Sequence, residues 1–297
     1  MKLFILGNGF DLKHELPTKY HPNFYSAARR EGTLDFFQNC CNINDKDSWN
    51  NFEKSLSECD FDLEEIRENV LNSLTYDEDH HERYYSDMIY ESYKVVDILK
   101  KTLNAFLYEA EEKIKTTKPI KFFQSEFEKN VIIFITFNYT STLENVYKIE
   151  REKILYIHGK YQEGNKLIIG YPENEINEES IKLLREPYEY DHGAIADSIR
   201  IINSMPGEFQ KSYDTKKISD FLIKFSNEIE EIIVFGHSCN IDQPYFLKIN
   251  KLLPNVKWNF YWYIDEDKEH IFDLISYLKL SESNFKLIAS REINSTL

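Results

Sequence analysis

The chain has 297 residues, of which 42% are hydrophobic and 15% aromatic, and it carries a formal net charge of −15. This apolar content excludes a disordered chain, and the length allows one large core or two modest ones. Because the surface is acidic and basic residues occur in runs no longer than pairs, generic duplex DNA is not an expected partner.

The sequence also limits the compartment. No stretch approaches the roughly 20 apolar residues of a membrane-spanning helix, so no membrane partner is expected. The apolar run 3–6 ends at Gly7 and is too short for the core of an export signal. The four cysteines contain no CxxC pair, which argues against a zinc site or a disulfide framework. We therefore expect a cytoplasmic protein with reduced thiols and no bound metal.

Continuous apolar runs are typical of strands that are buried on both faces of a parallel sheet. In chain order they are residues 3–6, 131–137, 154–157, 167–169, 232–235, 258–264 and 285–289. Helical patterns separate several of these runs, as parallel βαβ units require. The sequence predicts an α/β fold with a parallel Rossmann-like sheet and helices on both faces.

A long helical segment interrupts this pattern. There is no glycine or proline between Gly32 and Pro119, and apolar residues recur at helical spacing from 89 to 114, which predicts one long amphipathic helix. We expect a single α/β nucleotide-binding domain over residues 1–297, with a large all-helical insertion over approximately 20–128. Residues 172–220 are expected to form a helix-and-loop region.

The strongest local signal is the turn Gly7-Asn8-Gly9-Phe10-Asp11, which follows the first apolar run and begins a helix. Glycine allows a ligand to approach the backbone closely, and a helix N-terminus presents N–H donors to a phosphate. The GxGxxG fingerprint is incomplete because Leu12 replaces the third glycine. The turn is therefore compatible with a phosphate-binding turn and with an ordinary tight βα turn.

A second polar turn follows the run 131–137. It contains Asn138, Tyr139, Thr140 and Ser141, at the carboxyl end of a predicted strand, where open parallel sheets bind ligands. Asn138, Thr140 or Ser141 is expected to cap the next helix, which leaves the other side chains available to a ligand.

Two later runs end in similar turns. One ends in His158-Gly159 and the other in Gly236-His237-Ser238. The hydroxyl of Ser238 can donate to a phosphate, and Asp242 is expected to cap a helix whose first turn contains Pro244. A lone histidine at a strand end is more often structural than catalytic. The convergence of four polar turns on one sheet edge nevertheless predicts a ligand site.

Taken in order, these motifs resemble the AbiH abortive-infection family from residue 3 to about residue 246. The resemblance rests on Ile5-Leu6-Gly7-Asn8-Gly9-Phe10-Asp11-Leu12, Leu16-Pro17-Thr18-Lys19-Tyr20, Trp49 with Phe52-Glu53, Thr136-Phe137-Asn138-Tyr139-Thr140, Thr142-Leu143-Glu144, Ile157-His158-Gly159, and Gly236-His237-Ser238 followed by Asp242. It implies an antiphage defence protein that responds to a phage-derived trigger.

The family pattern is in turn similar, at a distance, to the sirtuin-like fold, whose members bind or cleave NAD. The shared features are a Gly-x-Gly turn, an asparagine at position 138, a histidine followed by glycine, and a late Gly-x-Ser turn. Asn8 and Thr140 depart from the sirtuin pattern, and the lack of a four-cysteine zinc module argues against protein deacetylation. The resemblance implies NAD as substrate or ligand.

Hydrolysis of the nicotinamide–ribose bond needs phosphate binding, a positioned water and a base. Asn138 is expected to hold the water or a ribose hydroxyl. His158 is expected to act as the base, since the pKa of a histidine is ordinarily near ~6.5. The residues expected to bind the nucleotide are Gly7, Asn8, Gly9, Phe10, Asp11, Thr136, Tyr139, Gly236, His237, Ser238 and Asp242.

The leading hypothesis is an NAD glycohydrolase, and the alternative is a non-enzymatic nucleotide sensor that switches a defence partner. A nuclease lacks a metal-binding carboxylate set and conflicts with the net charge. Glu53, four residues after Trp49, can either reach the site or pair with a nearby lysine. The helical insertion offers a surface for a homo-oligomer, although a helix that packs on its own core has the same pattern.

Overall fold

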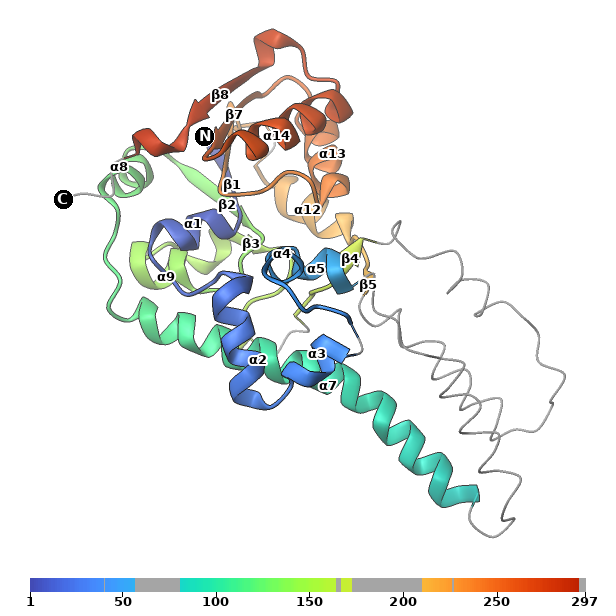
Figure 1. Ribbon diagram of the computed structural model, residues 1–297. Coiled ribbons are helices and arrows are strands. Elements are labelled where there is room, and N and C mark those ends of the chain that lie inside the picture. The colour runs from blue at the N-terminus through green and yellow to red at the C-terminus, as the bar shows by residue number, and fades with distance from the viewer. Residues whose placement is uncertain (40, 57–80, 164–166, 173–209, 226, 294–297) are drawn as a thin grey trace, which may run out of the picture. The chain divides into compact units, whose positions relative to one another are not determined.

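The computed structural model describes residues 1–39, 41–56, 81–163, 167–172, 210–225 and 227–293 (Figure 1). The chain forms two compact units. Unit 1 comprises Met1–Lys19, Leu107–Ile168 and Tyr213–Leu297, and unit 2 comprises Tyr20–Phe106 and Ile169–Ser212.

Unit 1 is built on a six-stranded sheet in which every neighbouring pair of strands is parallel. The strands are β1 (Lys2–Leu6), β2 (Ile132–Thr136), β3 (Ile154–Tyr156), β6 (Glu231–Phe235), β7 (Lys257–Trp262) and β8 (Phe285–Ala289). Their order is β3-β2-β1-β6-β7-β8, the doubly wound order of dinucleotide-binding sheets, and the winding reverses between β1 and β6. The predicted parallel α/β fold is confirmed.

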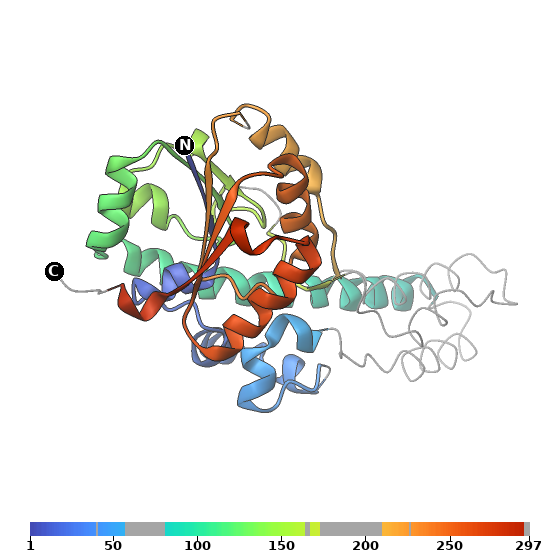
Figure 2. The same cartoon turned by 90° about the horizontal axis from the view of Figure 1, so that it is seen from above.

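Helices cover both faces of this sheet. One face carries α1 (Asn8–Lys13), α8 (Lys121–Lys129) and α9 (Thr142–Tyr147), and the other carries α12 (Thr215–Leu222), α13 (Gln243–Leu252) and α14 (Asp265–Leu278). Figure 2 shows the green helices α8 and α9 on one side of the sheet and the orange and red helices on the other. Single turns of 3-10 helix lie at Arg151–Lys153, Glu282–Asn284 and Ser290–Glu292.

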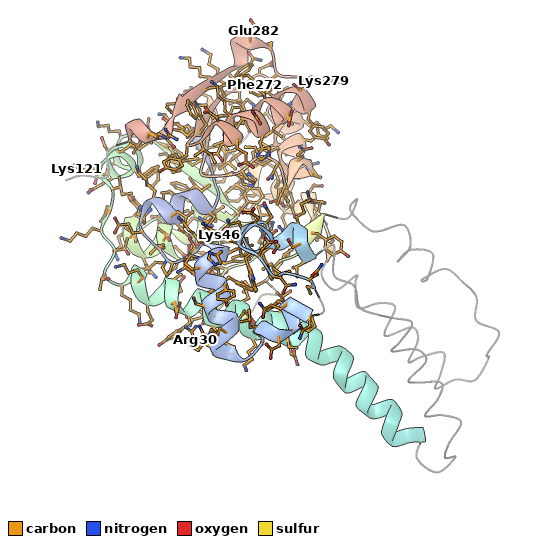
Figure 3. The ribbon with its side chains drawn as sticks, viewed as in Figure 1. Arg30, Lys46, Lys121, Phe272, Lys279 and Glu282 are labelled. Carbon is orange, nitrogen blue, oxygen red and sulfur yellow. The ribbon has the colours of Figure 1, made fainter. Side chains whose placement is uncertain are left out.

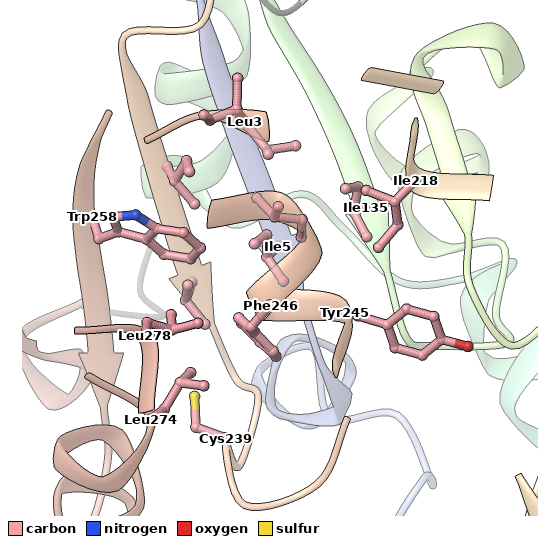
Figure 4. Packing of buried hydrophobic residues seen from close by; sticks show 14 of the residues in the cluster. Leu3, Ile5, Ile135, Ile218, Cys239, Tyr245, Phe246, Trp258, Leu274 and Leu278 are labelled. Carbon is pink, nitrogen blue, oxygen red and sulfur yellow. The ribbon is translucent and has the colours of Figure 1, made fainter. Parts of the chain in front are cut away.

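The alternation of side chains along β1 explains why its sequence is continuously apolar. Leu3 and Ile5 point into the core under α12, α13 and α14, and Phe4 and Leu6 point into the core on the opposite face. All four are essentially inaccessible to solvent, and each such burial stabilises the fold by about 1.5–3 kcal/mol. Figure 4 shows Leu3 and Ile5 within the larger core, which also contains Trp258.

The helix α14 shows how one helix serves both core and surface. Its residues Ile271 and Leu274 are buried, whereas Phe272 is 46% exposed. Figure 3 labels Phe272 together with Lys279 and Glu282, which are also exposed. The apolar stripe at helical spacing therefore faces the sheet.

Within its described residues, unit 2 is mainly helical and has an aromatic core. Its described elements are the kinked turn η1 (Tyr20–Phe24), in which His21 is extended, α2 (Tyr25–Glu31), α3 (Leu34–Asn39), α4 (Lys46–Asn50), α5 (Phe52–Ser55), the part of α7 (His81–Ile114) up to Phe106, and a two-stranded parallel sheet of β4 (Tyr171–Pro172) and β5 (Gln210–Lys211). Trp49 stacks on Phe52 at 5.7 Å between ring centroids, and both contact Phe24. The long helix expected to end near 114 is confirmed as α7.

Two segments differ from the expected organisation. Residues 167–169 do not form a strand. Instead, Ile168 donates its N–H to the carbonyl of His158 at 2.9 Å and accepts a hydrogen bond from the Tyr139 hydroxyl at 2.6 Å. Residues 107–128, which the sequence placed in the helical insertion, belong to unit 1, where Phe123 of α8 is buried against the sheet.

The described residues cover the expectations for region 172–220 and for the cysteines only in part. Most of the predicted helix-and-loop region 172–220 lies outside the described residues. Cys239 is a free thiol as expected, but Cys41 is disulfide-bonded, so the expectation of reduced thiols is wrong at Cys41. Cys40 and Cys59 lie outside the described residues. Among the helices that the structure describes, none has the length and apolar character needed to cross a membrane.

Candidate functional site

The four polar turns of the sequence lie at one edge of the sheet in unit 1. They follow β1, β2, β3 and β6, which are adjacent and parallel, so their carboxyl ends meet. This edge contains the point between β1 and β6 where the winding reverses, and sheets of this order bind ligands there. Buried polar side chains form two clusters at the edge. The Asp11 cluster consists of Asp11, Asn138, Thr140 and Thr142, and the histidine cluster consists of His158, His237 and Asp242.

The glycines of the first turn pack against the turn that follows β6. The N–H of Gly7 donates to the carbonyl of Phe235 at 3.0 Å, and the N–H of Gly9 donates to the carbonyl of Gly236 at 2.8 Å. A Cβ atom on Gly9 would lie 2.5 Å from the Cα of Gly236. These glycines therefore allow two backbones to touch, and their N–H groups are already used. Binding of a phosphate by this turn stays a prediction.

The neighbours of these glycines also have internal partners. Asn8 donates its Nδ2 to the carbonyl of Thr18 at 2.7 Å. Phe10 is 1% exposed, and its ring contacts Phe123 at 5.0 Å and His14 at 4.6 Å between centroids. Phe10 therefore serves the core on the α1 face of the sheet.

Asp11 is a buried carboxylate held by two threonine hydroxyls. Its Oδ2 accepts a hydrogen bond from Thr140 at 2.6 Å, and its Oδ1 accepts one from Thr142 at 2.7 Å. Burial raises the pKa of Asp11 to about 6, and the hydrogen bonds from Thr140, Thr142 and Asn138 oppose this rise, whereas the charge of Glu111 adds to it. The Asp11 carboxyl is therefore ionised at neutral pH.

The loop between β2 and α9 is bonded to the protein through each of its polar side chains. Asn138 donates its Nδ2 to the carbonyl of Gly7 at 3.1 Å, and the backbone N–H of Asn138 donates to the hydroxyl of Thr136 at 3.1 Å. Ser141 donates its N–H at 2.7 Å and its hydroxyl at 2.5 Å to the two carboxylate oxygens of Glu111. Ser141 is the N-cap residue of α9, but its side chain does not cap the helix. The expected cap by Asn138, Thr140 or Ser141 is therefore wrong.

The histidine cluster places one carboxylate between two imidazoles. Nε2 of His158 lies 3.4 Å from Oδ1 of Asp242, and Nε2 of His237 lies 3.7 Å from Oδ2. All three side chains are at least nine-tenths buried. Nδ1 of His237 accepts a hydrogen bond from the N–H of Cys239 at 3.0 Å, which places the proton of the neutral ring on Nε2, facing Asp242.

The position of Asp242 is as predicted, but its role at the helix is not. It immediately precedes α13, which has a proline in its first turn, yet its side chain makes no capping hydrogen bond. Its backbone is left-handed, with φ of 66°. This conformation accompanies a carboxylate that faces the two histidines.

Aromatic side chains surround the two imidazoles. The ring of Phe137 lies 5.3 Å from that of His158 and 4.4 Å from that of His237. Phe246 lies 5.0 Å from His237, and Tyr245 lies 6.4 Å from His158. A surrounding of low polarity strengthens the attraction between the carboxylate and a protonated imidazole.

Several partners in this site were not among the predicted residues. Glu111 is one of several glutamates in a long helical pattern, so no sequence signal distinguishes it. Thr142 belongs to one of the family motifs but was not a predicted site residue, although its hydroxyl donates to Asp11. Ser238, which the sequence assigned to phosphate binding, is exposed and donates to the side chain of Asn240 at 2.6 Å. Within the described residues, no group of three or more histidine, cysteine or acidic side chains is arranged to hold a metal ion.

Comparison with known proteins assigns the family. No curated protein and no solved structure matches the chain. The family model described as bacteriophage abortive infection AbiH matches residues 3–262. This range contains all four polar turns and every residue of the two clusters. The chain therefore belongs to the AbiH family of bacteriophage abortive-infection proteins.

Proposed function

We propose that this abortive-infection protein acts in the cytoplasm by hydrolysing the nicotinamide–ribose bond of NAD to nicotinamide and ADP-ribose. The observation that carries the proposal is the pairing of His158 with Asp242 at the reversal point of the sheet. Sheets with this strand order bind dinucleotides at that edge. The distant similarity of the motifs to the sirtuin-like fold supports the same substrate.

The reaction suits a site with a base and no general acid. Water attacks C1′ of the ribose while the C–N bond breaks, and the bonding electron pair neutralises the cationic nicotinamide nitrogen. The attacking water must lose a proton, and His158 is the group proposed to accept it. With Nε2 turned towards Asp242, Nδ1 is the nitrogen left for the water. The charge of the Asp242 carboxylate, whose Oδ1 lies 3.4 Å from Nε2, stabilises the imidazolium that forms.

Asn138 and Ser238 have complementary roles in this proposal. The amide nitrogen of Asn138 is used by the carbonyl of Gly7, so its amide oxygen can accept a hydrogen bond from the water or a ribose hydroxyl. The exposed hydroxyl of Ser238 can exchange its bond to Asn240 for one to a phosphate. The N–H groups of Gly7 and Gly9 already have partners. In this proposal the diphosphate therefore binds at the turn after β6 rather than at the first glycine turn.

One observation is equally compatible with the alternative of a nucleotide sensor without catalysis. Every polar side chain from 138 to 142 has a partner within the protein, and such a pre-organised surface suits ligand binding as well as catalysis. In that case the protein would bind the nucleotide and switch a defence partner.

The deciding experiment incubates pure protein with NAD, with and without lysate from phage-infected cells as trigger. We expect equal amounts of free nicotinamide and ADP-ribose by chromatography, and a strong loss of both in His158→Ala. His270→Ala is the matched control because His270 lies on α14 and belongs to neither cluster. Binding of NAD by calorimetry without cleavage in either condition would favour the sensor. If NAD is neither bound nor cleaved in either condition, both the hydrolase and the sensor are refuted.

A further inference from the structure

The Asp11 cluster joins two segments that are distant in the chain. Asp11 lies on α1, and the threonines that it binds lie 129 and 131 positions later, in the loop after β2 and at the start of α9. Asp11, Thr140 and Thr142 are 1%, 4% and 1% exposed. Because solvent has so little access, a lost hydroxyl–carboxylate bond is not readily replaced by one to water.

The two hydrogen bonds use both oxygens of one carboxylate. Thr140 donates to Oδ2 and Thr142 donates to Oδ1, so the two residues cannot move independently of Asp11. Hydrogen bonds to an ionised acceptor are stronger than those between neutral groups. The pKa of Asp11, about 6, keeps the acceptor charged at pH 7.5 despite its burial.

Asn138 stands two residues before Thr140 in the same loop. Its side chain donates to the carbonyl of Gly7 at 3.1 Å, and this carbonyl belongs to the turn that leads into α1. The Asn138 side chain also hydrogen-bonds the Asp11 carboxylate. On the other side of Thr140, Ser141 is held by Glu111. The position of the Asn138 amide therefore depends on how the loop is fixed to α1 on one side and to α7 on the other.

We propose that Asp11 is a positioning residue that sets Asn138 at the site by holding Thr140 and Thr142. It acts through the two threonines and through its own hydrogen bond with Asn138, and it binds no substrate itself. The role of Asn138 in this inference, holding the water or a ribose hydroxyl, rests on the proposed function. The fixation of the loop by Asp11 can be measured without an activity assay.

The first measurement is hydrogen exchange of the amides from 138 to 142 in the full chain at pH 7.5. Thr140→Val with Thr142→Val removes both hydroxyls and keeps the side-chain shape. We expect a loss of protection of about tenfold or more, since each bond contributes to the opening equilibrium of the loop. Both single valine variants are measured too, so that the result does not depend on the double variant folding.

The matched control is Thr102→Val. Thr102 is a buried threonine of unit 2 whose hydroxyl pairs with that of Thr33 at 2.6 Å. It should leave the protection of 138–142 unchanged. Thr140→Ser and Thr142→Ser keep the hydroxyls and should retain protection. Unchanged exchange in the folded valine variants would overturn the proposal, whatever the activity.

The second measurement is the rate of nicotinamide release. Misplacement of Asn138 should lower kcat by roughly 10²-fold in the double valine variant, with little change in KM, and the serine variants should restore it. Lost protection with an unchanged kcat would overturn the positioning role. A wild-type protein that releases no nicotinamide under any condition would contradict the proposed function alone, because the exchange measurement still decides whether Asp11 fixes the loop.

Discussion

Oδ1 of Asp242 lies 3.4 Å from Nε2 of His158, although Asp242 is the residue immediately before α13, where an aspartate side chain usually caps the helix. Its left-handed backbone and its missing cap each cost stability, on the order of 1 kcal/mol or more. The carboxylate is instead shared between His158 and His237. Strain of this kind persists where the surroundings enforce it, and it concentrates at functional sites.

The pairing predicts the effect of removing the charge. Asp242→Asn keeps the size of the side chain but can no longer stabilise an imidazolium at His158. We expect nicotinamide release to fall roughly 10²- to 10⁴-fold, as in His158→Ala, while the fold is retained. Asp273→Asn, on the exposed side of α14, is the control and should keep the wild-type rate. Equal rates for Asp242→Asn and wild type would leave the pair without a catalytic role.

The packing of the two glycine turns predicts a stability effect at Gly9. A Cβ there would meet the backbone of Gly236, which cannot yield as a flexible side chain can. We expect Gly9→Ala to lower the free energy of unfolding by roughly 1–3 kcal/mol, measured by urea denaturation. Gly32→Asn is the comparison, because no atom lies within 4 Å of a Cβ at Gly32 and asparagine tolerates its left-handed φ of 69°. A Gly9→Ala protein as stable as wild type would contradict the close contact.

The sheet could be predicted from the sequence because burial on both faces leaves a continuous apolar run. Leu3 and Phe4 point to opposite faces, yet both are buried, so the pattern is unambiguous. The run 167–169 has the same composition but forms no strand. With three residues it carries too little pattern to distinguish a strand from a loop, and Ile168 finds its hydrogen-bond partners in other loops.

The site could be predicted as a location but not as a set of contacts. Parallel strands bring the polar turns to one edge, and this follows from chain order alone. The pairing of side chains depends on backbone torsions such as the left-handed φ of Asp242. No pattern in the sequence predicts that torsion. The glycines of the first turn illustrate the same limit, since a close approach of Gly236 and a close approach of a phosphate require the same residue.

The buried ion pair of unit 2 predicts a large effect on stability. Glu53 of α5 pairs with Lys211 of β5, which confirms that this glutamate pairs with a lysine, and it accepts a hydrogen bond from the Tyr20 hydroxyl at 2.5 Å. Lys211 is 2% exposed, so Glu53→Gln takes a carboxylate away from a buried ammonium group. We expect a loss of about 3–5 kcal/mol in urea denaturation, with partial recovery when Lys211→Met is added.

The control for this pair is Glu112→Gln. Glu112, in the last turn of α7, pairs with Lys115 just after the end of that helix in unit 1, and both side chains are well exposed. An exposed pair contributes at most about 1 kcal/mol. Equal losses in Glu53→Gln and Glu112→Gln would mean that the burial of Lys211 has little energetic consequence.

The net charge predicts the outcome of a binding assay with nucleic acid. Non-specific binders hold duplex DNA with Kd on the order of 10⁻⁴ to 10⁻⁶ M at physiological salt. With a net charge of −15, we expect no shifted band at micromolar protein in a gel-shift assay at that salt. Binding that weakens steeply as salt increases would revive a nucleic-acid target.

The burial of Asp11 predicts a pH dependence of stability whose sign follows from its pKa. The pKa is about 6 in the folded protein, against an ordinary value of 3.8. Between these values the folded state keeps a proton that the unfolded chain has released. The contribution of Asp11 to stability is therefore fully present below about pH 3.8 and is lost as the pH rises through about 6. The loss amounts to about 3 kcal/mol, since each pKa unit corresponds to about 1.4 kcal/mol.

The measurement is urea denaturation of wild type and of Asp11→Asn at intervals from pH 4 to pH 8. Asparagine has the size of aspartate and does not titrate, so the difference between the two free energies of unfolding isolates residue 11. We expect wild type to lose stability relative to Asp11→Asn as the pH rises through this window. A constant difference would mean that Asp11 does not titrate there. If the loss is found, the charge of Asp11 opposes folding at neutral pH. A residue that lowers stability is typically retained because function requires it. The hydrogen bonds of Asp11 to Thr140 and Thr142 then indicate that this function is to fix the loop that carries Asn138.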